Sequence, residues 1–273
     1  MAGILSVVST PIGNLRDITL RAIDVLKSAD LIACEDTRHT HVLLDEYSIG
    51  TSTTSYHKFN IRQKTKYLID QMISGKNVAL VSDAGTPGIS DPGEELIASA
   101  ISAGIKIEIV PGASAAVSAL AISGIRADRY TFEGFLPSKS SERRAKLKVL
   151  SGEDRTMIFY EAPHRLTGSL RDIRDALGDR RISVSRELTK KFEETTRGMI
   201  SDLIKKYDDR PPRGEIVLVV EGAKKIKIKN SENEEGLVAE LIKAGLSRNS
   251  ASKIVSKRFG VSKNALYRGS LRG

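Results

Sequence analysis

The sequence predicts an α/β protein built around a mainly parallel sheet with helices on both faces. Between residues 4 and 122, short apolar runs rich in valine and isoleucine alternate with segments of helical period. Such alternation is typical of parallel sheets, because each helix returns the chain to the start of the next strand. A second series of strands and helices lies between residues 156 and 221, and residues 234–273 have a purely helical pattern.

The first series supports a parallel sheet element by element. Its apolar runs predict strands at Ile4–Ser9, Leu31–Glu35, Val78–Ser82 and Lys106–Val110. The periodic segments between and after these runs predict helices at Thr19–Ala29, Thr37–Tyr47, Ile61–Ile73, Pro92–Ala103 and Ala115–Ile122. The helices are long enough to cross over the sheet between neighbouring strands.

A break at residues 135–141, which are rich in serine and contain Pro137, separates a second α/β domain. Beyond the break, strands are predicted at Thr156–Glu161, Ile182–Glu187 and Glu215–Glu221. Helices are predicted at His164–Leu177 and Met199–Tyr207. We therefore expect two domains that each contain a sheet, at 1–136 and 137–223.

The final part of the chain predicts a small helical module. Residues 224–235 are rich in Lys, Asn and Glu and predict a solvated linker. Residues 236–273 form the module, in which Ser247 and Ser262 are good N-caps for the last two helices. The helical segments are Glu234–Ala244, Asn249–Phe259 and Lys263–Leu271, a pattern similar to a helix-turn-helix.

The positive charge of the chain is concentrated in this module and its linker. The whole chain has 43 Lys and Arg against 34 Asp and Glu, yet residues 224–273 alone hold 12 basic and 4 acidic residues. Such a field favours a polyanionic partner, most simply nucleic acid. A solubilising tail or a docking unit is the alternative. The candidate phosphate contacts are Lys253, Lys257, Arg258, Lys263, Arg268 and Arg272.

Composition excludes several other classes of protein. No run of 18 or more apolar residues is present, and the first residues are not expected to be a signal peptide. Cys34 is the only cysteine, so a disulfide within one chain is excluded and a reducing cytoplasm is favoured. The four histidines lack zinc-ligand spacing, and no metal site is predicted.

Three loops that follow predicted strands are the candidate ligand site. Ser82–Gly93 contains three Gly, two Pro and two Asp, which allow sharp bends and a close approach of the backbone to a ligand. Ser9–Leu15 matches neither a dinucleotide-binding nor a phosphate-binding glycine motif. With Val110–Ala116, these loops would meet at one edge of a parallel sheet. Taken singly, each loop could be a surface turn or a site of close helix–sheet packing.

In combination, the loops closely resemble those of the tetrapyrrole methylase superfamily, and most closely its branch of ribosomal RNA small subunit methyltransferases I. The resemblance spans about residues 9 to 221. Its motifs are Pro11–Thr19, Glu35–Arg38, Ser82–Gly93, Phe132–Pro137, Tyr160–Arg165, Arg186–Lys190 and Arg213–Glu215. It implies the two-domain fold of class III methyltransferases, with a parallel-sheet first domain, a mixed-sheet second domain and a basic helical appendage.

The resemblance also implies a cofactor and a reaction. S-adenosylmethionine would bind between the two α/β domains, and the acceptor would be the 2′-hydroxyl of a cytidine in the decoding centre of 16S rRNA. A homodimer in the cytoplasm is expected. The implied cofactor contacts are Pro11, Asp83, Gly85, Thr86, Gly88, Ile89, Ser90, Ser114, Ala115, Glu161 and Leu188.

Transfer of a methyl group to a ribose hydroxyl needs alignment and a group that removes the hydroxyl proton. Carboxylates, or a lysine whose pKa is lowered, could serve as this base. The candidates near strand ends are Glu35, Asp36, Glu187 and Lys190, and the sequence does not select one of them. Lys190 and Arg38 could instead hold an RNA phosphate, and each of these residues could also form an ordinary surface ion pair.

Two other functions remain open from the sequence. A small-molecule methyltransferase of the same fold could act on a tetrapyrrole, although the basic module weighs against this function. The chain could also be an RNA-binding ribosome assembly factor without catalytic activity.

Overall fold

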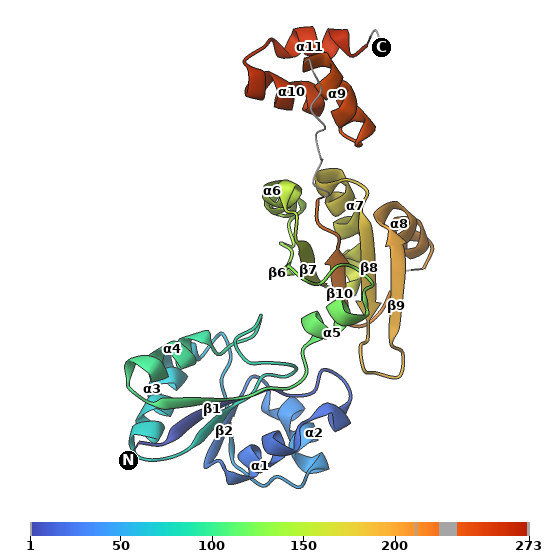
Figure 1. The fold of residues 1–273 in the computed structure, drawn as a ribbon. Helices are drawn as coiled ribbons and strands as arrows, with labels where there is room; N and C mark the ends of the chain where they lie inside the picture. The colour runs from blue at the N-terminus through green and yellow to red at the C-terminus, as the bar shows by residue number, and fades with distance from the viewer. Residues whose placement is uncertain (1, 211, 224–233, 272–273) are drawn as a thin grey trace. The chain divides into compact units, whose positions relative to one another are not determined.

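The computed structural model describes residues 2–210, 212–223 and 234–271. The chain divides into two compact units, Met1–Gly222 and Ala223–Gly273 (Figure 1). In these described ranges, the first unit contains two five-stranded sheets and the second contains three helices.

The first sheet is fully parallel, in the strand order β3-β2-β4-β1-β5. Its strands are β1 (Ile4–Val8), β2 (Leu31–Cys34), β3 (Thr53–Ser55), β4 (Val78–Leu80) and β5 (Lys106–Val110). The helices that connect them are α1 (Leu20–Ser28), α2 (Thr37–Glu46), α3 (Ile61–Ile73) and α4 (Glu94–Ser102). The parallel sheet predicted from the alternation of strands and helices is confirmed.

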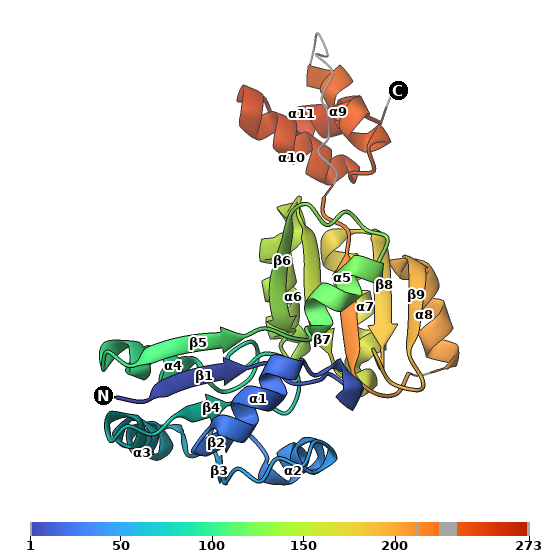
Figure 2. The same ribbon diagram turned by 60° about the horizontal axis from the view of Figure 1, so that its bottom comes forward.

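Buried side chains on both faces of this sheet explain its apolar strands. Leu5 and Val7 pack with α3 and α4 on one face, and Val8 packs with α1 and α2 on the other. Alternate strand residues point to opposite faces, so a strand covered on both sides must be apolar throughout. Figure 2 shows the two helical layers on either side of the sheet.

The second sheet is mixed, in the order β6-β7-β10-β8-β9. Only β6 and β7 run parallel, and the other pairs are antiparallel. Its strands are β6 (Tyr130–Phe135), β7 (Thr156–Glu161), β8 (Arg181–Arg186), β9 (Glu194–Met199) and β10 (Ile216–Val220). One face is covered by α6 (Ser140–Val149), α7 (Leu166–Leu177) and α8 (Ile200–Asp209).

The opposite face of the second sheet is covered by α5 (Ala115–Ile122), which follows the last strand of the first sheet. Ala119 and Leu120 of α5 pack against Ile158 of β7 and Val219 of β10. The chain thus passes from one sheet to the other between Val110 and Ala115. The predicted boundary at residue 136 lies beyond this passage. The serine-rich break on which it was based comes after β6, which already belongs to the second sheet.

Four of the strands and α-helices were not predicted from the sequence: the edge strands β3, β6 and β9 and the charged helix α6. β3 has three residues, and β9 is an edge strand that carries Glu194 and Arg197. α6 contains four basic residues and buries only Arg143 and Leu147. Edge strands and charged helices bury few apolar side chains, so their periodic signals are weak.

The second unit is a three-helix module with its own core. It contains α9 (Glu234–Lys243), α10 (Arg248–Phe259) and α11 (Lys263–Gly269). Ser247 and Ser262 cap α10 and α11, as predicted, by accepting bonds from the backbone N–H groups of Ser250 and Ala265. Its core contains Leu237, Val238, Leu241, Ala251, Val255 and Leu266. Of the predicted linker, residues 224–233 lie outside the described residues.

Across the parts of the chain that the structure describes, no helix is long and apolar enough to cross a membrane.

Candidate functional site

The three predicted loops meet at the carboxyl edge of the first sheet. Thr10 and Gly85 exchange two backbone hydrogen bonds of 2.9 and 3.1 Å, and Ser9 Oγ lies 2.8 Å from Thr86 Oγ1. The third loop packs so closely that a Cβ placed on Gly112 would lie 3.0 Å from Ser9 Cβ. Three loops that are far apart in the sequence therefore form one continuous surface.

This surface forms a wall of a cavity of about 520 Å³ that also touches the second sheet. The opposite wall comes from the ends of β7 and β10 and from the loop after β8. Nine of the predicted cofactor residues line the cavity: Asp83, Gly85, Thr86, Ile89, Ser90, Ser114, Ala115, Glu161 and Leu188. Of the other two, Pro11 lines a neighbouring cavity, and Gly88 is not among the residues that line either one.

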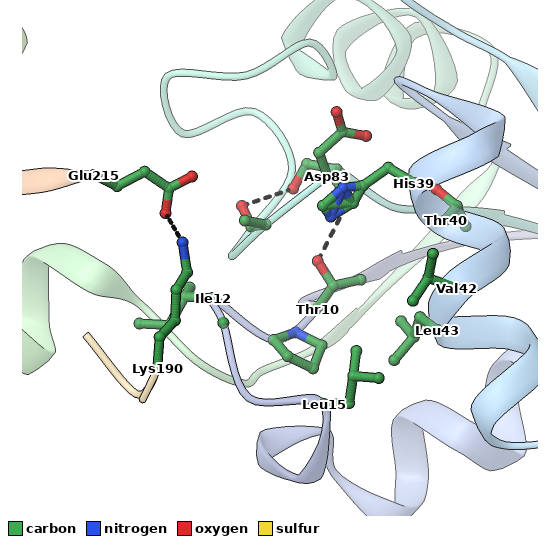
Figure 3. A pocket seen from close by; sticks show the side chains of 14 residues that line it. Thr10, Ile12, Leu15, His39, Thr40, Val42, Leu43, Asp83, Lys190 and Glu215 are labelled. Carbon is green, nitrogen blue, oxygen red and sulfur yellow. Dashed lines mark hydrogen bonds and ion pairs between the residues drawn. The ribbon is translucent and has the colours of Figure 1, made fainter. Parts of the chain in front are cut away.

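The neighbouring cavity is smaller, about 170 Å³, and lies between the first loop, α2 and the loop after β8 (Figure 3). Pro11, Leu15, Val42 and Leu43 give it an apolar side, and His39, Lys190 and Glu215 also line it. Four residues line both cavities: Ile12, Asp83, Ala84 and Glu215.

Three carboxyl groups line the larger cavity near the first sheet. Burial, together with the neighbouring charges of Glu35 and Asp83, raises the pKa of Asp91 to about 6. Burial and Asp83 also raise the pKa of Glu35. Asp83 Oδ1 accepts the backbone N–H of Asp36 at 3.0 Å, which holds the loop after β2 against the loop after β4. Sequence reasoning missed Asp91 as a site residue, since an Asp before Pro92 also suits an ordinary turn.

Asp36 has a structural role instead of lining a cavity. Its Oδ1 accepts the backbone N–H of Arg38 at 2.9 Å and so caps α2. The Arg38 guanidinium also binds this carboxylate, with Nη2 2.7 Å from Oδ2. These bonds lower the pKa of Asp36 to about 2. Arg38 itself is highly exposed, at 90% of its side chain.

Glu187 fixes the position of Glu215, which lies directly before β10 and lines the smaller cavity. Its backbone N–H donates to Glu215 O, and its Oε1 accepts the Glu215 N–H at 3.1 Å. Gly214 is required beside it, because any Cβ there would overlap the Glu187 carboxylate. Burial alone would raise the pKa of Glu187, but the Glu215 N–H and the Lys190 ammonium hold this pKa below its usual value.

Lys190 forms ion pairs with two glutamates. Its Nζ lies 3.1 Å from Glu187 Oε1 and 3.0 Å from Glu215 Oε2. Burial alone would lower the pKa of Lys190, but the bonds to Glu215 and Glu187 raise it above its usual value. Lys190 is therefore an ammonium at neutral pH and is a poor proton acceptor.

Glu161 lines the larger cavity, but both of its oxygens are already bound. Oε1 accepts from the Ala162 N–H and the Arg165 guanidinium, and Oε2 accepts from Ser169 Oγ. The side chain is almost fully buried. Its role at the cavity wall is thus to fix the turn after β7.

Of the predicted RNA contacts of the basic module, Arg272 lies outside the described residues, and the other five lie on α10 and α11. Lys253, Lys257, Arg258 and Arg268 are exposed, and Lys263 is half-buried. Arg258 lies over the ring of Phe259 at 5.6 Å. Among the described residues, no group of three or more His, Cys, Asp and Glu side chains is placed to hold a metal ion.

Comparisons with known proteins connect this site to a family. Residues 5–204 match the family model of the Tetrapyrrole (Corrin/Porphyrin) Methylases. The chain is 45% identical to ribosomal RNA small subunit methyltransferase I of Synechocystis, over 98% of each chain. It is 45% identical to the protein of the same name from Bacillus subtilis, over 96% of this chain and 90% of that relative.

Solved structures share the fold at much lower identity. Uroporphyrin-III C-methyltransferase from Thermus thermophilus matches with a TM-score of 0.59 and 21% identity, over 80% of this chain and 94% of that one. The methyltransferase CobJ matches with a TM-score of 0.63 and 18% identity, over 84% and 98% of the two chains. The two-sheet α/β architecture, the site between the sheets and these matches lead to one conclusion: the chain belongs to the tetrapyrrole methylases, a methyltransferase family, in the branch of ribosomal RNA small subunit methyltransferase I.

Proposed function

We propose that this protein transfers a methyl group from S-adenosylmethionine to the ribose 2′-hydroxyl of a cytidine in the decoding centre of 16S rRNA. The observation that carries the proposal is the single cavity of about 520 Å³ lined by nine of the residues that the family resemblance implies for the cofactor. The names of the relatives support ribosomal RNA of the small subunit as the acceptor.

The chemistry of the larger cavity fits this methyl donor. Ile12, Ala84, Leu188 and Val217 offer apolar contacts to a nucleoside, and Thr86, Ser90 and Ser114 offer hydroxyl groups. The carboxylates of Glu35, Asp83 and Asp91 suit a ligand that carries positive charge, because opposite charges attract strongly in a partly buried site. When bound, the donor supplies an activated methyl group on a sulfonium.

The contribution of the protein to catalysis is mainly positional. A rigid wall made by three interlocked loops holds one reactant, and the adjoining smaller cavity offers space for the other. Alignment of this kind can contribute about 7–11 kcal/mol to lowering the barrier. Of the four predicted catalytic residues, Glu35 and Lys190 line the cavities, whereas Asp36 and Glu187 hold the surrounding loops.

RNA binding is proposed for the basic residues of α10 and α11, with Arg38 as a further contact at the site. We also propose that the chain acts in the cytoplasm as a homodimer. Exposed apolar side chains on the edge strands β5 and β6 and on α5 support pairing. They are Ile109, Val117, Ile122, Tyr130, Phe132 and Phe135.

The test is methyl transfer from labelled S-adenosylmethionine to purified small ribosomal subunits, followed by nuclease digestion and mass spectrometry of the nucleosides. A 2′-O-methylcytidine from the decoding centre is the expected product. Transfer only to a tetrapyrrole would replace the proposed acceptor. Tight RNA binding without any transfer would favour an assembly factor.

A separate measurement tests the donor site. Asp83→Arg should abolish S-adenosylmethionine binding in calorimetry, since a guanidinium would enter the cavity where a cationic donor is proposed. Unchanged affinity in this variant would overturn the assignment of the larger cavity to the donor.

A further inference from the structure

The boundary between the two cavities carries an inference about catalysis that rests on the proposed function. If the larger cavity holds the methyl donor, the acceptor oxygen must reach that methyl group from the neighbouring space. The residues that line both cavities are Ile12, Asp83, Ala84 and Glu215. A base that acts on the acceptor hydroxyl must be able to reach this boundary, and only two of these residues carry an ionisable side chain.

We propose that the acceptor nucleoside occupies the smaller cavity and that Glu215 is the general base that takes the proton from its reactive hydroxyl. Glu215 is not among the four residues that the sequence predicted as catalytic. In that prediction Arg213–Glu215 counted only as a family motif.

The lining of the smaller cavity suits a nucleoside. Its apolar side, formed by Pro11, Leu15, Val42 and Leu43, offers contact for a base or sugar ring. Figure 3 shows the Lys190–Glu215 pair on the opposite side of the cavity from Val42 and Leu43. A ring held against the apolar side would thus have its hydroxyl groups near the ion pair.

Glu215 is better placed as a base than Asp83. Asp83 Oδ1 is occupied by the backbone N–H of Asp36, a bond that holds two loops together. The backbone of Glu215 is fixed on both sides by Glu187, yet its side chain is 74% exposed. A fixed backbone with an accessible carboxylate is the arrangement that a base for an incoming substrate needs.

Lys190 supports this role as a cation. Its ammonium lies 3.0 Å from Glu215 Oε2 and can stabilise negative charge that develops on the acceptor oxygen. When Glu215 gains a proton and becomes neutral, Lys190 keeps its second ion pair with Glu187, at 3.1 Å. The proton transfer therefore leaves no unpaired ammonium at the site.

Proton removal and methyl transfer conserve all atoms and electrons without a metal ion or a redox partner. The O–H bond of the acceptor breaks and its proton goes to a Glu215 oxygen, while an electron pair of the hydroxyl oxygen forms the new O–C bond. The bond between the methyl carbon and the sulfonium sulfur breaks, and its electron pair remains on sulfur.

The decisive variant is Glu215→Gln, which keeps the shape of the side chain but removes its basicity. Turnover on small subunits should fall by about 10²–10⁴-fold, the usual contribution of a general base. Donor affinity measured by calorimetry, subunit affinity measured by filter binding and the melting temperature should stay at wild-type values. The matched control is Glu142→Gln, which alters the exposed pair between Lys139 and Glu142 at the start of α6 and should leave turnover unchanged.

A second variant separates a catalytic role from a structural one. In Glu215→Ala, added formate should restore part of the lost turnover, because a small carboxylate can enter the vacated space and accept the proton. Full turnover by Glu215→Gln would overturn the inference, as would an inactive Glu215→Ala that formate does not rescue. Either result with an active wild-type enzyme leaves the proposed function intact, whereas an inactive wild-type enzyme would overturn the proposed function itself.

Discussion

At the scale of single residues, Asp91 gives the site a dependence on pH. Its pKa is raised from 3.8 to about 6 by burial and by the charges of Glu35 and Asp83. A pKa that is higher in the folded than in the unfolded state means that the folded state binds more protons. The stability that comes from this proton is complete below about pH 4 and is lost as the pH rises through 6.

Asp91→Asn should therefore stabilise the empty protein increasingly as the pH rises. The melting temperature of the variant minus that of the wild type should grow between pH 4 and 7, because an amide is neutral at every pH. Differential scanning calorimetry across this range measures the difference. A difference that stays constant with pH would contradict the raised pKa.

The same residue predicts how donor binding depends on pH. A cationic donor prefers the ionised carboxylate, so its affinity should weaken as the pH falls below 6, and binding near pH 6 should release a proton. Calorimetry in two buffers with different ionisation enthalpies detects that proton. Asp91→Asn should abolish its release. Equal heats for the wild type in both buffers would refute the linkage.

Gly214 is a residue whose identity is dictated by its neighbours. Its φ of +84° favours glycine, and a Cβ would overlap the Glu187 carboxylate. Gly214→Ala should cost about 1–3 kcal/mol or more in the free energy of unfolding and should displace Glu215. Urea titration measures the loss. Gly50→Ala is the control, since a Cβ there meets no atom within 4 Å, and equal stability of both variants would exclude the predicted overlap.

At the scale of elements, a buried ion pair joins α6 to α7. Arg143 Nε lies 2.7 Å from Asp172 Oδ2, and both side chains are less than 10% exposed. Asp172→Ala would leave a buried guanidinium without its partner and should cost about 3–5 kcal/mol. Thermal or urea unfolding measures this cost. Asp208→Ala, which breaks the exposed pair with Arg171, should cost at most about 1 kcal/mol.

The predictable elements are those that bury apolar side chains on a regular period. The strand Lys106–Val110 and the helices Ile61–Ile73 and Ala115–Ile122 have the bounds that the sequence predicts. β9 was missed because its pairing with β8 is made by backbone groups, while only Met199 among its side chains is apolar and none is fully buried. Backbone pairing leaves no period in the sequence.

The candidate site was predictable where it is made of loops and not where it depends on packing between distant segments. The glycines and prolines of Ser82–Gly93 predict a sharply bent loop directly from the sequence. The boundary position of Glu215 depends on two hydrogen bonds with Glu187, which lies 28 residues away along the chain: the Glu187 N–H donates to Glu215 O, and Glu187 Oε1 accepts the Glu215 N–H. That contact leaves no local pattern, so the sequence could not distinguish Glu215 from a surface glutamate.

At the scale of the whole molecule, the charge of the second unit predicts a salt effect. Replacing Lys253, Lys257, Arg258, Lys263 and Arg268 by Gln in the full chain should weaken RNA binding, with donor affinity unchanged. The slope of log affinity against log salt should become shallower by about 0.7 for each lost contact to single-stranded RNA. Filter binding at several salt concentrations gives this slope.

A control variant tests whether the salt dependence of RNA binding depends on where the basic residues lie, and not only on the total charge of the protein. Gln at Arg62 and Lys66, two exposed residues of α3, should leave the slope nearly unchanged. An equal decrease per charge at both places would mean that the protein attracts RNA through its overall charge alone. The basic module would then have another purpose.

The passage of α5 from one sheet to the other has a thermodynamic consequence. The chain leaves β5 of the first sheet, and the far end of α5 is anchored to the second by Arg197, whose Nε donates to Ile122 O at 3.1 Å. The loops of the first sheet also share a core with the second, in which Ile12 clusters with Leu188 and Ile158, so the sheets cannot separate without exposing these apolar side chains. We therefore expect both sheets to melt in one calorimetric peak, and a ligand held between them to move that whole peak rather than split it.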